Sequence, residues 1–332
     1  MSVEVFRTIV QIQPSERKIN YHTPIILVGS CFTENIGEKL NYYKFPQSLN
    51  PFGITYNPFS AAQSIHQIMD NKQFARGELG FANDLFYSFD HHSKFSDQNP
   101  EKCLNKINSS ITQANNAMNK AVFLFITLGS AYYYTHKDSG KIVSNCHKLP
   151  DSEFNRSLAE MDDIVQAYNN LFIRLIKFNP ELQVVFTISP IRHWKDGAHE
   201  NQVSKAALHL SVEKLCRMFN HVTYFPAYEL MLDELRDYRF YEEDMLHPNK
   251  TAIDFIWKRF VTAFMGSDTH KIMNEVDKIQ LARLHRPFNA NTEAFQSFVV
   301  QQINKIKYLT EQYPGINLTS EYEYFRSHLG EI

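Results

Sequence analysis

The sequence lacks the features that mark membrane-spanning, secreted or disulfide-rich proteins. No stretch approaches the roughly 20 apolar residues that a transmembrane helix needs. The first thirty residues mix charged and apolar side chains, and none of their runs resembles the apolar core of a signal peptide. The 4 cysteines contain no C-x-x-C pair, so neither a disulfide framework nor a zinc knuckle is indicated. We therefore expect a soluble, cytoplasmic protein with reduced thiols.

A strong charge imbalance is also absent. The 34 lysines and arginines nearly balance the 36 aspartates and glutamates, which leaves a formal net charge of −2. Proteins that bind nucleic acid or anionic membranes usually carry an excess of positive charge. We therefore expect no nucleic-acid and no membrane partner, and a small or neutral molecule as the ligand. The oligomeric state is left open by the sequence.

Short apolar runs alternate along the chain with stretches of helical periodicity. This alternation predicts an α/β fold in which helices cover both faces of a parallel sheet. The predicted strands are Ile25–Val28, Gln47–Leu49, Ala121–Leu128, Val184–Ser189 and Val222–Phe225. The predicted helices are Glu34–Tyr43, Pro58–Met69, Cys103–Asn119, Leu158–Phe178, Gln202–Phe219, Ala227–Leu235 and Pro248–Phe264, and Ser157 with Glu160 resembles a capping box before the fourth of them.

The pattern changes after Gly266-Ser267-Asp268, where only helices are predicted. Apolar residues near helical spacing continue to Leu309. Because roughly 65 residues of helix alone bury little core, we expect residues 266–332 to form a helical extension. It would pack on an α/β domain of residues 1–265 and contain a linker around Arg286–Asn291.

The most informative segment is Ile25–Thr33, where an apolar run ends at Gly29-Ser30 and helix-forming residues follow. Glycine permits a sharp turn, and the unpaired N–H groups at a helix start can stabilise negative charge beside Ser30. The pattern is typical of a nucleophile, although many strand-to-helix turns read Gly-Ser without doing chemistry. Cys31 is a rival because a thiolate is intrinsically more nucleophilic. Only one of two adjacent residues on a turn can face the same base.

A second motif, Asp244-Met245-Leu246-His247, follows the last predicted strand. An aspartate three residues before a histidine can accept a hydrogen bond from Nδ1 and leave Nε2 free to take a serine proton. The carboxyl ends of parallel strands meet at one edge of the sheet, so this loop and Ser30 can meet there. The spacing alone is also typical of a helix cap with an incidental histidine. Together with Ser30 it favours a Ser-His-Asp triad.

The block Gly29-Ser30-Cys31-Phe32 resembles the signature of the GSCFA-domain family, a branch of the SGNH (GDSL-like) hydrolase superfamily. Thr33 stands where the signature has alanine. Other similar blocks are Asn50-Pro51-Phe52-Gly53, Thr127-Leu128-Gly129-Ser130, Asn145-Cys146-His147, Ser189-Pro190 and Asp244-x-x-His247. The blocks span about residues 25 to 260, and no motif covers the tail.

The resemblance implies a flavodoxin-like three-layer α/β/α sandwich and cleavage of an acyl ester through an acyl-serine intermediate. Ser30 would be the nucleophile, His247 the general base and acid, and Asp244 the residue that orients His247. No metal and no organic cofactor is required by this mechanism.

The resemblance also implies an oxyanion hole formed by the N–H of Ser30, the N–H of Gly53 and an asparagine amide. The chain has Gly129-Ser130-Ala131-Tyr132 where a GDSL-type enzyme has Gly-x-Asn-Asp, so the asparagine is missing there. The Ser130 hydroxyl, the Asn145 amide or backbone groups would have to replace it.

Four residues near the similar blocks are candidates for contact with a small-molecule or carbohydrate ester: His147, Tyr132, His193 and Asn57. Ordinary packing explains such residues equally well. His199, Asn201 and Lys205 similarly form either a polar patch or the solvated start of a helix. By analogy, the acyl group is short. An acyltransferase with the same site, and a weakly active or non-catalytic carbohydrate-binding relative, are the alternatives.

Overall fold

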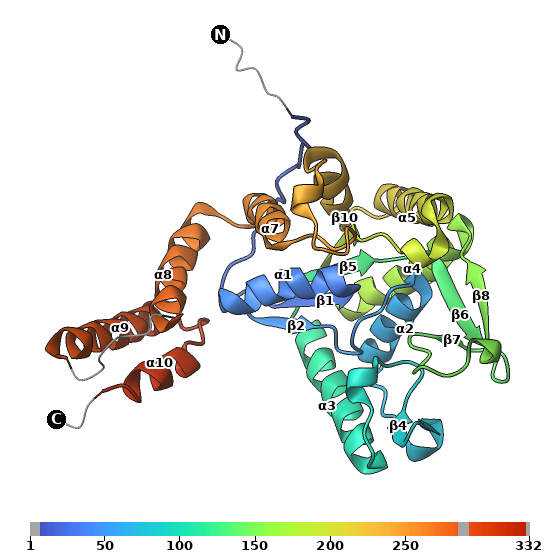
Figure 1. Ribbon diagram of the computed structural model, residues 1–332, viewed down its shortest axis with the longest axis horizontal. Helices are drawn as coiled ribbons and strands as arrows, with labels where there is room; N and C mark the ends of the chain where they lie inside the picture. Colours follow the sequence, from blue (N-terminus) through green and yellow to red (C-terminus); the bar gives the residue numbers. More distant parts are fainter. Residues whose placement is uncertain (1–6, 285–291, 330–332) are drawn as a thin grey trace, which may run out of the picture. The chain divides into compact units, whose positions relative to one another are not determined.

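A five-stranded parallel sheet carries the fold, which Figure 1 shows for the computed structural model. The structure describes residues 7–284 and 292–329. The strands of this sheet are β1 (Ile25–Gly29), β2 (Gln47–Leu49), β5 (Phe123–Leu128), β9 (Gln183–Ile188) and β10 (Val222–Tyr224). Their order is β10-β9-β5-β1-β2, with every pair parallel. This is the strand order of flavodoxin-like folds, and all five strands were predicted.

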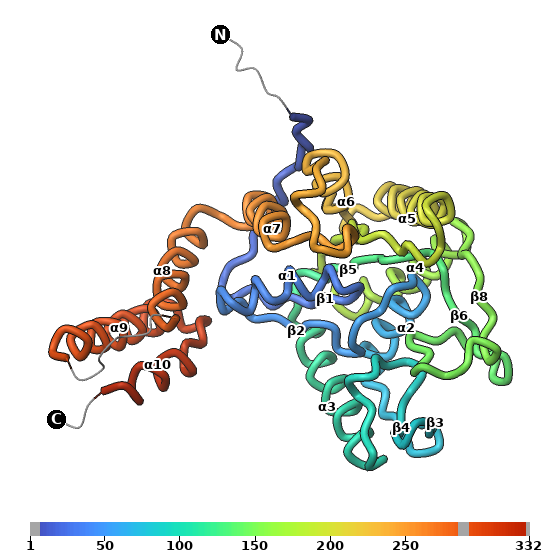
Figure 2. The backbone as a smooth tube through the Cα atoms, in the orientation of Figure 1, coloured from blue at the N-terminus to red at the C-terminus, as the bar shows by residue number. Residues whose placement is uncertain are grey.

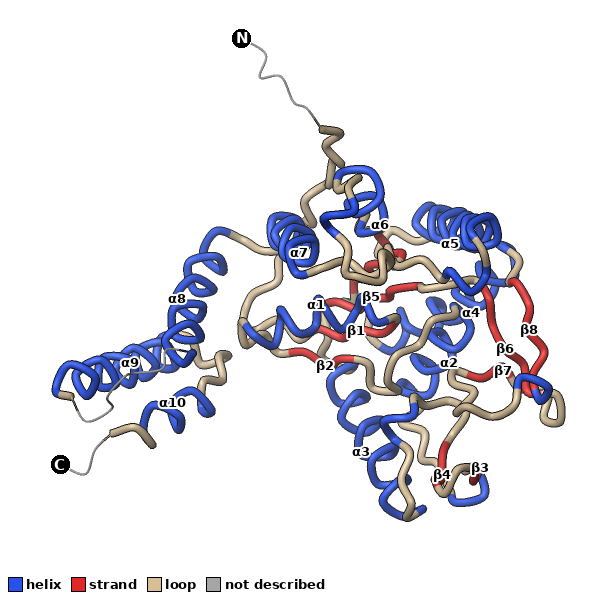
Figure 3. Tube along the Cα trace, in the orientation of Figure 1, coloured by secondary structure: helices blue, strands red, loops and turns tan. Residues whose placement is uncertain are grey.

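Helices cover both faces of this sheet (Figure 3). Ile26 and Val28 of β1 pack in one core with buried side chains of α2 (Pro58–Met69), α3 (Pro100–Met118), α4 (Met161–Phe178) and α5 (Ala198–Met218). Ile25 and Leu27 are equally buried and, because side chains alternate along a strand, belong to the opposite face. Further buried residues outside that core come from α1 (Cys31–Tyr42) and α7 (Lys250–Phe264). The predicted three-layer arrangement is therefore confirmed.

The remaining elements are short and lie between these helices and strands. Figure 2 follows the backbone from β1 directly into α1. The last predicted helix before α7 consists of one helical turn, α6 (Ala227–Glu229), and a π-helical turn at Leu230–Glu234. Short 3₁₀ turns occur at Arg76–Glu78, Ser93–Phe95, Asp151–Glu153, Trp194–Asp196 and Tyr238–Phe240. No helix within the described ranges is long and apolar enough to cross a membrane.

Two antiparallel sheets were not predicted. One is the hairpin of β3 (Gly80–Ala82) and β4 (Leu85–Tyr87). The other joins β6 (Tyr132–His136), β7 (Ile142–Val143) and β8 (Phe154–Leu158) in the order β7-β6-β8. The predicted start of the helix at Leu158 was therefore wrong. Ser157 pairs with Tyr133 across β6 and β8, so it cannot form a capping box, and α4 begins at Met161.

The chain divides into two compact units. The first unit contains the described residues up to Ile12 together with Ile25–Gly37 and Gln47–Arg259. The second contains Gln13–Pro24, Glu38–Pro46 and the described residues from Phe260 onward, including α8 (Ser267–Leu284), α9 (Glu293–Gln312) and α10 (Thr319–Arg326). The helices predicted beyond residue 266 are thus present, whereas the predicted linker at Arg286–Asn291 lies outside the described residues.

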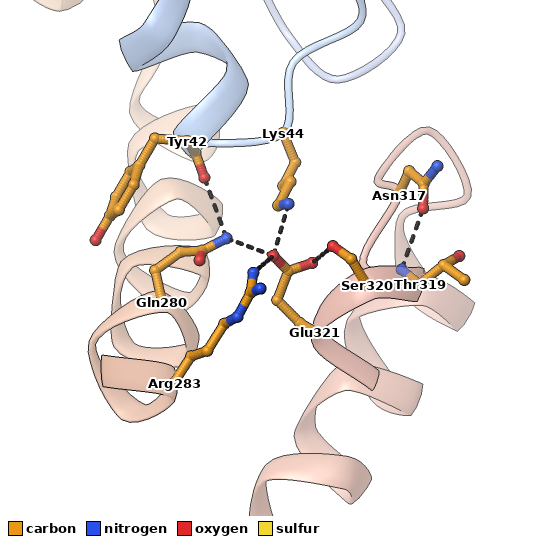
Figure 4. A network of polar contacts seen from close by, with 8 residues as sticks. All are labelled: Tyr42, Lys44, Gln280, Arg283, Asn317, Thr319, Ser320 and Glu321. Atoms are coloured by element: carbon orange, nitrogen blue, oxygen red, sulfur yellow. Dashed lines mark hydrogen bonds and ion pairs between the residues drawn. The ribbon is translucent and has the colours of Figure 1, made fainter. Parts of the chain in front are cut away.

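A buried carboxylate connects several parts of the second unit (Figure 4). The Glu321 side chain of α10 has no solvent-exposed area, and Lys44 Nζ lies 2.6 Å from its Oε1. Gln280 and Arg283 of α8 contact the same oxygen at 3.0 Å and 3.3 Å, and Ser320 donates to Oε2 at 3.0 Å. Burial opposes ionisation, but the hydrogen bonds from Lys44 and Gln280 outweigh it and lower the pKa of Glu321 below its usual range.

Candidate active site

Ser30 lies at the end of β1, where the chain turns into α1. The turn requires glycine at position 29, because φ is +148° and an added Cβ would lie 2.3 Å from the Thr127 carbonyl oxygen. The Ser30 side chain is nearly inaccessible, with 1% exposure of the residue. Its Oγ has no hydrogen-bond partner in the part of the chain that the structure describes. Buried hydroxyl groups are normally paired, so this free hydroxyl is a candidate for chemistry.

Asp244 and His247 form the hydrogen bond that their spacing predicts. His247 Nδ1 lies 2.5 Å from Asp244 Oδ2. The other carboxylate oxygen accepts the backbone N–H groups of Leu246 and His247, each at 2.9 Å. These backbone hydrogen bonds, followed by the one from the His247 side chain, lower the pKa of Asp244 to about 2. The carboxylate is therefore ionised and held in position at neutral pH.

Contacts through Gly129 and Tyr56 lead from Ser30 to His193. An added Cβ at Gly129 would lie 3.3 Å from Ser30 Cβ, and the N–H of Gly129 donates to the Tyr56 carbonyl at 2.9 Å. The Tyr56 ring meets His193 edge-on with 5.5 Å between ring centroids. Burial, then the charge of Lys205, lowers the pKa of His193 to about 4, and His247 is close enough to add to this effect. The predicted contact of His193 with substrate stays a prediction, and no hydrogen bond joins Ser30 and His247 among the described residues.

Two backbone N–H groups predicted for an oxyanion hole already have acceptors, and the Asn145 side chain is engaged through its oxygen. The N–H of Ser30 donates to Thr127 O at 3.2 Å, and the N–H of Gly53 donates to Asn50 O at 2.7 Å. Asn145 Oδ1 accepts the backbone N–H of His147 at 2.8 Å. These contacts fix the positions of the three groups, and their part in an oxyanion hole stays a prediction.

Ser130, the fourth predicted donor, is likewise engaged. Its Oγ accepts the N–H of Tyr132 at 3.1 Å and lies 3.3 Å from Ser204 Oγ. The Ser204 hydroxyl in turn accepts the N–H of Ala131 at 2.8 Å. This network supports the turn that follows β5, and the role of Ser130 in catalysis also stays a prediction.

Three further predicted substrate contacts have clear structural roles. Asn57 caps α2, because its Oδ1 accepts the N–H of Ser60 at 2.8 Å. The Tyr132 ring is covered by the Arg156 guanidinium, which lies 3.7 Å from the ring centroid. His147 Nε2 lies 2.8 Å from Ser88 O. Among the described residues, no hydrogen bond, ion pair or ring contact joins these three residues to Ser30, Asp244 or His247.

His147 and Asn145 instead line a separate pocket of about 650 Å³. Tyr87 lies in the same pocket and stacks on His147 with 4.5 Å between ring centroids. Burial lowers the pKa of His147. Neither Ser30 nor His247 is among the lining residues, so this pocket does not belong to the candidate triad.

Lys205 and Asn201 are further functional candidates, for which the sequence allowed either a polar patch or the solvated start of a helix. Both residues are buried, with 2% and 1% exposure. The prediction that they belong to a solvated helix start was therefore wrong. Lys205 Nζ lies 2.6 Å from Gly129 O and 2.7 Å from Ser189 O, which follow β5 and β9. Asn201 Oδ1 accepts the N–H of His193 at 3.0 Å. Their four-residue spacing on one helix face is the signal that could have identified them.

Burial lowers the pKa of the Lys205 amine far below its usual range. Removal from water lowers its pKa to about 7. A neutral amine retains two N–H donors, which matches the two carbonyl oxygens that Lys205 contacts. Both protonation states can therefore hold the ends of β5 and β9 together beside Ser30.

The Asp244 loop lines a pocket of about 420 Å³. Aromatic and cationic side chains surround it, including Trp194 and Tyr238, which are 53% and 73% exposed, and Arg192. Arg192 lies 6.0 Å from the Trp194 ring centroid. This pocket offers flat apolar faces and hydrogen-bond donors next to the candidate general base.

The structure also bears on two alternatives to a serine nucleophile. Burial raises the pKa of the Cys31 thiol, and backbone hydrogen bonds from Phe32 and Cys31 itself only partly oppose this effect. A protonated thiol is a poor nucleophile, so Ser30 is favoured over Cys31. No group of three or more histidine, cysteine, aspartate or glutamate residues that could hold a metal ion occurs within residues 7–284 and 292–329.

Family comparison decides the classification of the chain. Residues 24–260 match the model of the GSCFA family. The chain belongs to the GSCFA family. Residues 276–331 match a second model, described as the C-terminal domain of GSCFA domain proteins. No curated protein matches the chain in sequence.

Several solved structures are similar to parts of this GSCFA-family protein. A carbohydrate esterase of family 3 from Talaromyces cellulolyticus is 9% identical and has a TM-score of 0.34, with 77% of this chain and 99% of that chain covered. A family 2 carbohydrate esterase from Clostridium thermocellum, solved with cellohexaose, is 13% identical with a TM-score of 0.35 and coverage of 81% and 67%. An acetyl xylan esterase from the rumen bacterium Butyrivibrio proteoclasticus is 11% identical with a TM-score of 0.35 and coverage of 77% and 65%. Values this low say nothing about the reaction of the present chain.

Proposed function

We propose that this GSCFA-family protein is a serine esterase that uses Ser30, His247 and Asp244 as a catalytic triad. The observation that carries the proposal is the 2.5 Å hydrogen bond between Asp244 and His247. Ser30 supplies a buried hydroxyl that has no hydrogen-bond partner among the described residues. A carboxylate that holds Nδ1 leaves Nε2 as the acceptor for a serine proton.

In the proposed reaction, Ser30 Oγ attacks the carbonyl carbon of an ester while His247 Nε2 takes the hydroxyl proton. The tetrahedral intermediate collapses, the C–O bond to the alcohol breaks, and the imidazolium gives its proton to the departing alkoxide. Water then attacks the acyl-serine and loses a proton to the same nitrogen. The acid is released and Ser30 Oγ recovers the proton from His247.

Two features of the pocket beside Asp244 support a sugar ester as substrate. The exposed rings of Trp194 and Tyr238 can cover the flat face of a sugar ring. Arg192 supplies donors for hydroxyl or carbonyl oxygens. Asp244 lines this pocket, whereas Ser30 and His247 do not, so we propose that it holds the sugar part of a carbohydrate that carries a short acyl group. The cytoplasmic location and the absence of nucleic-acid partners stay predictions from composition.

An acyltransferase with the same residues is the second candidate. Ser30 is only 1% exposed, so bulk water has little access to this position. The acyl-serine intermediate is the same in both reactions. Only the acceptor in the second step differs.

Ester hydrolysis by the full chain tests the proposal. We expect the wild-type protein to hydrolyse p-nitrophenyl acetate faster than longer esters, and Ser30→Ala and His247→Ala to reduce kcat by at least about 10³-fold. Adding acylated and free sugars shows whether water or a hydroxyl group is the better acceptor. If the folded wild-type protein neither hydrolyses an ester nor transfers an acyl group, the result would instead support a non-catalytic binding protein.

A further inference from the structure

Four buried polar atoms without a hydrogen-bond partner lie around the Gly29–Ser30 turn within the described part of the chain. They are Ser30 Oγ, Thr33 Oγ1, Asn50 Nδ2 and Thr55 Oγ1, and each of these residues is 1% exposed. The N–H of Gly29 donates to Asn50 Oδ1 at 2.9 Å, and the carbonyl of Gly29 accepts the N–H of Thr55 at 3.0 Å. Asn50 and Thr55 are therefore held directly against the residue that precedes the proposed nucleophile.

The orientation of the Asn50 amide follows from chemistry. The N–H of Gly29 is a donor, so the side-chain atom that faces it must be the oxygen. The NH₂ group consequently points away from Gly29. Backbone contacts fix the residue as well, because the N–H of Asn50 donates to Leu27 O at 2.8 Å and its φ is +44°. Asparagine adopts this left-handed conformation more readily than most residues.

We propose that Asn50 Nδ2 is a side-chain donor of the oxyanion hole. This inference rests on the proposed esterase function. When Ser30 attacks, negative charge develops on the carbonyl oxygen, and preorganised amide donors are a common way to stabilise it. Asn50 has a free donor in a buried setting and a rigid anchor. It reaches the turn from the end of β2, on the opposite side of β1 from the Thr127 carbonyl that accepts the N–H of Ser30.

The same observations favour Asn50 over Asn145. Both side chains accept a backbone N–H through Oδ1, but Asn145 lines the separate pocket, whose lining residues do not include Ser30. Asn50, by contrast, is bonded to the residue next to Ser30. The free amide of Asn50 thus supplies the kind of donor that is absent from the turn after β5.

Asn50→Asp keeps the oxygen that accepts the N–H of Gly29 and replaces the NH₂ donor with an acceptor oxygen, which opposes negative charge on the oxyanion. Aspartate also tolerates the positive φ. We expect kcat for acetyl esters to fall by about 10²–10³-fold with little change in KM. Asn99→Asp is the matched control. Asn99 Oδ1 likewise accepts backbone N–H groups, those of Glu101 and Lys102, at the exposed start of α3. The activity of the Asn99→Asp variant should stay at the wild-type level.

A second readout separates donation to the oxyanion from a structural role. Sulfur is a weaker hydrogen-bond acceptor than oxygen, so the wild-type protein should hydrolyse an oxo ester faster than the matching thiono ester. We expect this rate ratio to fall by about tenfold in Asn50→Asp. If Asn50→Asp does not fold, Asn50→Gly, which also accepts the positive φ, is judged by the same ratio. An unchanged ratio in the folded variant overturns the role of Asn50 alone. A wild-type protein that cleaves no ester and leaves Ser30 unreactive overturns the esterase proposal and this inference together.

Discussion

His247 Nδ1 lies 2.5 Å from Asp244 Oδ2, on a loop whose backbone holds the same carboxylate through two further hydrogen bonds. This hydrogen bond fixes the orientation of the imidazole ring. It leaves Nε2 available to accept the proton of Ser30. Met245 adopts φ +59° between the two residues, which allows this tight turn. Asp244 therefore acts by orienting His247 and by stabilising its charge after proton transfer.

Asp244→Asn should leave the loop folded and slow the reaction strongly. The amide oxygen can still accept the N–H groups of Leu246 and His247, but the negative charge beside the imidazolium is lost. We expect kcat to fall by about 10²–10⁴-fold with KM nearly unchanged. Steady-state kinetics on a short acyl ester measures the loss.

Asp97→Asn is the control for this substitution. Asp97 also accepts a backbone N–H, that of Asn99 at 3.0 Å, and pairs with Lys106 at 2.8 Å on the exposed surface. Its replacement should leave kcat unchanged. An Asp244→Asn variant as active as Asp97→Asn would show that the carboxylate does not assist His247.

Cys31→Ala should retain esterase activity. Burial raises the pKa of the Cys31 thiol, so little thiolate is present at neutral pH and the neighbouring hydroxyl carries the reaction. We expect kcat within about threefold of the wild-type value, and slow alkylation of Cys31 by iodoacetamide at pH 7. Loss of activity in a folded Cys31→Ala variant would instead favour a thiol mechanism.

Lys205→Met should destabilise the first unit and lower the rate of ester hydrolysis. Methionine has a similar length but leaves the carbonyls of Gly129 and Ser189 without their donor. We expect a loss of about 2–4 kcal/mol in the free energy of unfolding, since each buried unpaired polar group costs about 1–3 kcal/mol. Lys214→Met is the control, because its exposed ion pair with Asp162 should contribute about 0–1 kcal/mol. Urea unfolding of the full chain measures both.

The Lys205 contribution should also depend on pH. Its pKa of about 7 in the folded protein lies below the value of about 10.4 for an unfolded lysine. Between these values the unfolded chain binds the extra proton, so the stability contributed by Lys205 rises with pH. The stability difference between the wild-type protein and Lys205→Met should therefore grow from pH 7 to pH 10. A difference that stays flat over this range would contradict the lowered pKa.

Glu321→Gln should destabilise the second unit. The buried carboxylate neutralises Lys44 and Arg283, both of which keep some access to water, so we expect a loss of about 2–3 kcal/mol, below the range for a fully buried pair. Its lowered pKa means that this stabilisation is complete above the unfolded pKa of about 4.3 and is lost as the pH falls through the lower folded pKa. The difference from wild type should shrink below about pH 4 in unfolding experiments. Glu323→Gln, at an exposed position of α10, should show neither effect.

The sequence allowed prediction of the central sheet because its strands are buried and apolar on both faces, as Ile25–Gly29 is. The antiparallel strands escaped detection for the opposite reason. Tyr132–His136 is half-buried throughout and lacks an apolar alternation, and its pairing with Phe154–Leu158 depends on contacts distant in sequence. For this reason the predicted helix began at Leu158, which is the last residue of β8, and not at Met161, where α4 begins.

The candidate triad could be predicted because its chemistry lies in local motifs. The Asp244 to His247 spacing allows a hydrogen bond between the two side chains, and the structure contains that bond. Asn50 and Lys205 could not be identified in the same way. Their importance comes from burial and from partners 21 and 76 residues away in sequence. The four-residue spacing of Asn201 and Lys205 places them on one helix face but does not show that this face is buried.

Covalent labelling tests the central claim most directly. A fluorophosphonate reacts with an activated serine and forms a stable adduct, and peptide mass spectrometry of the full chain locates it. We predict a single adduct at Ser30, absent from Ser30→Ala and strongly slowed in His247→Ala. A folded wild-type protein that stays unlabelled, or an adduct on Cys31 in place of Ser30, would contradict the account.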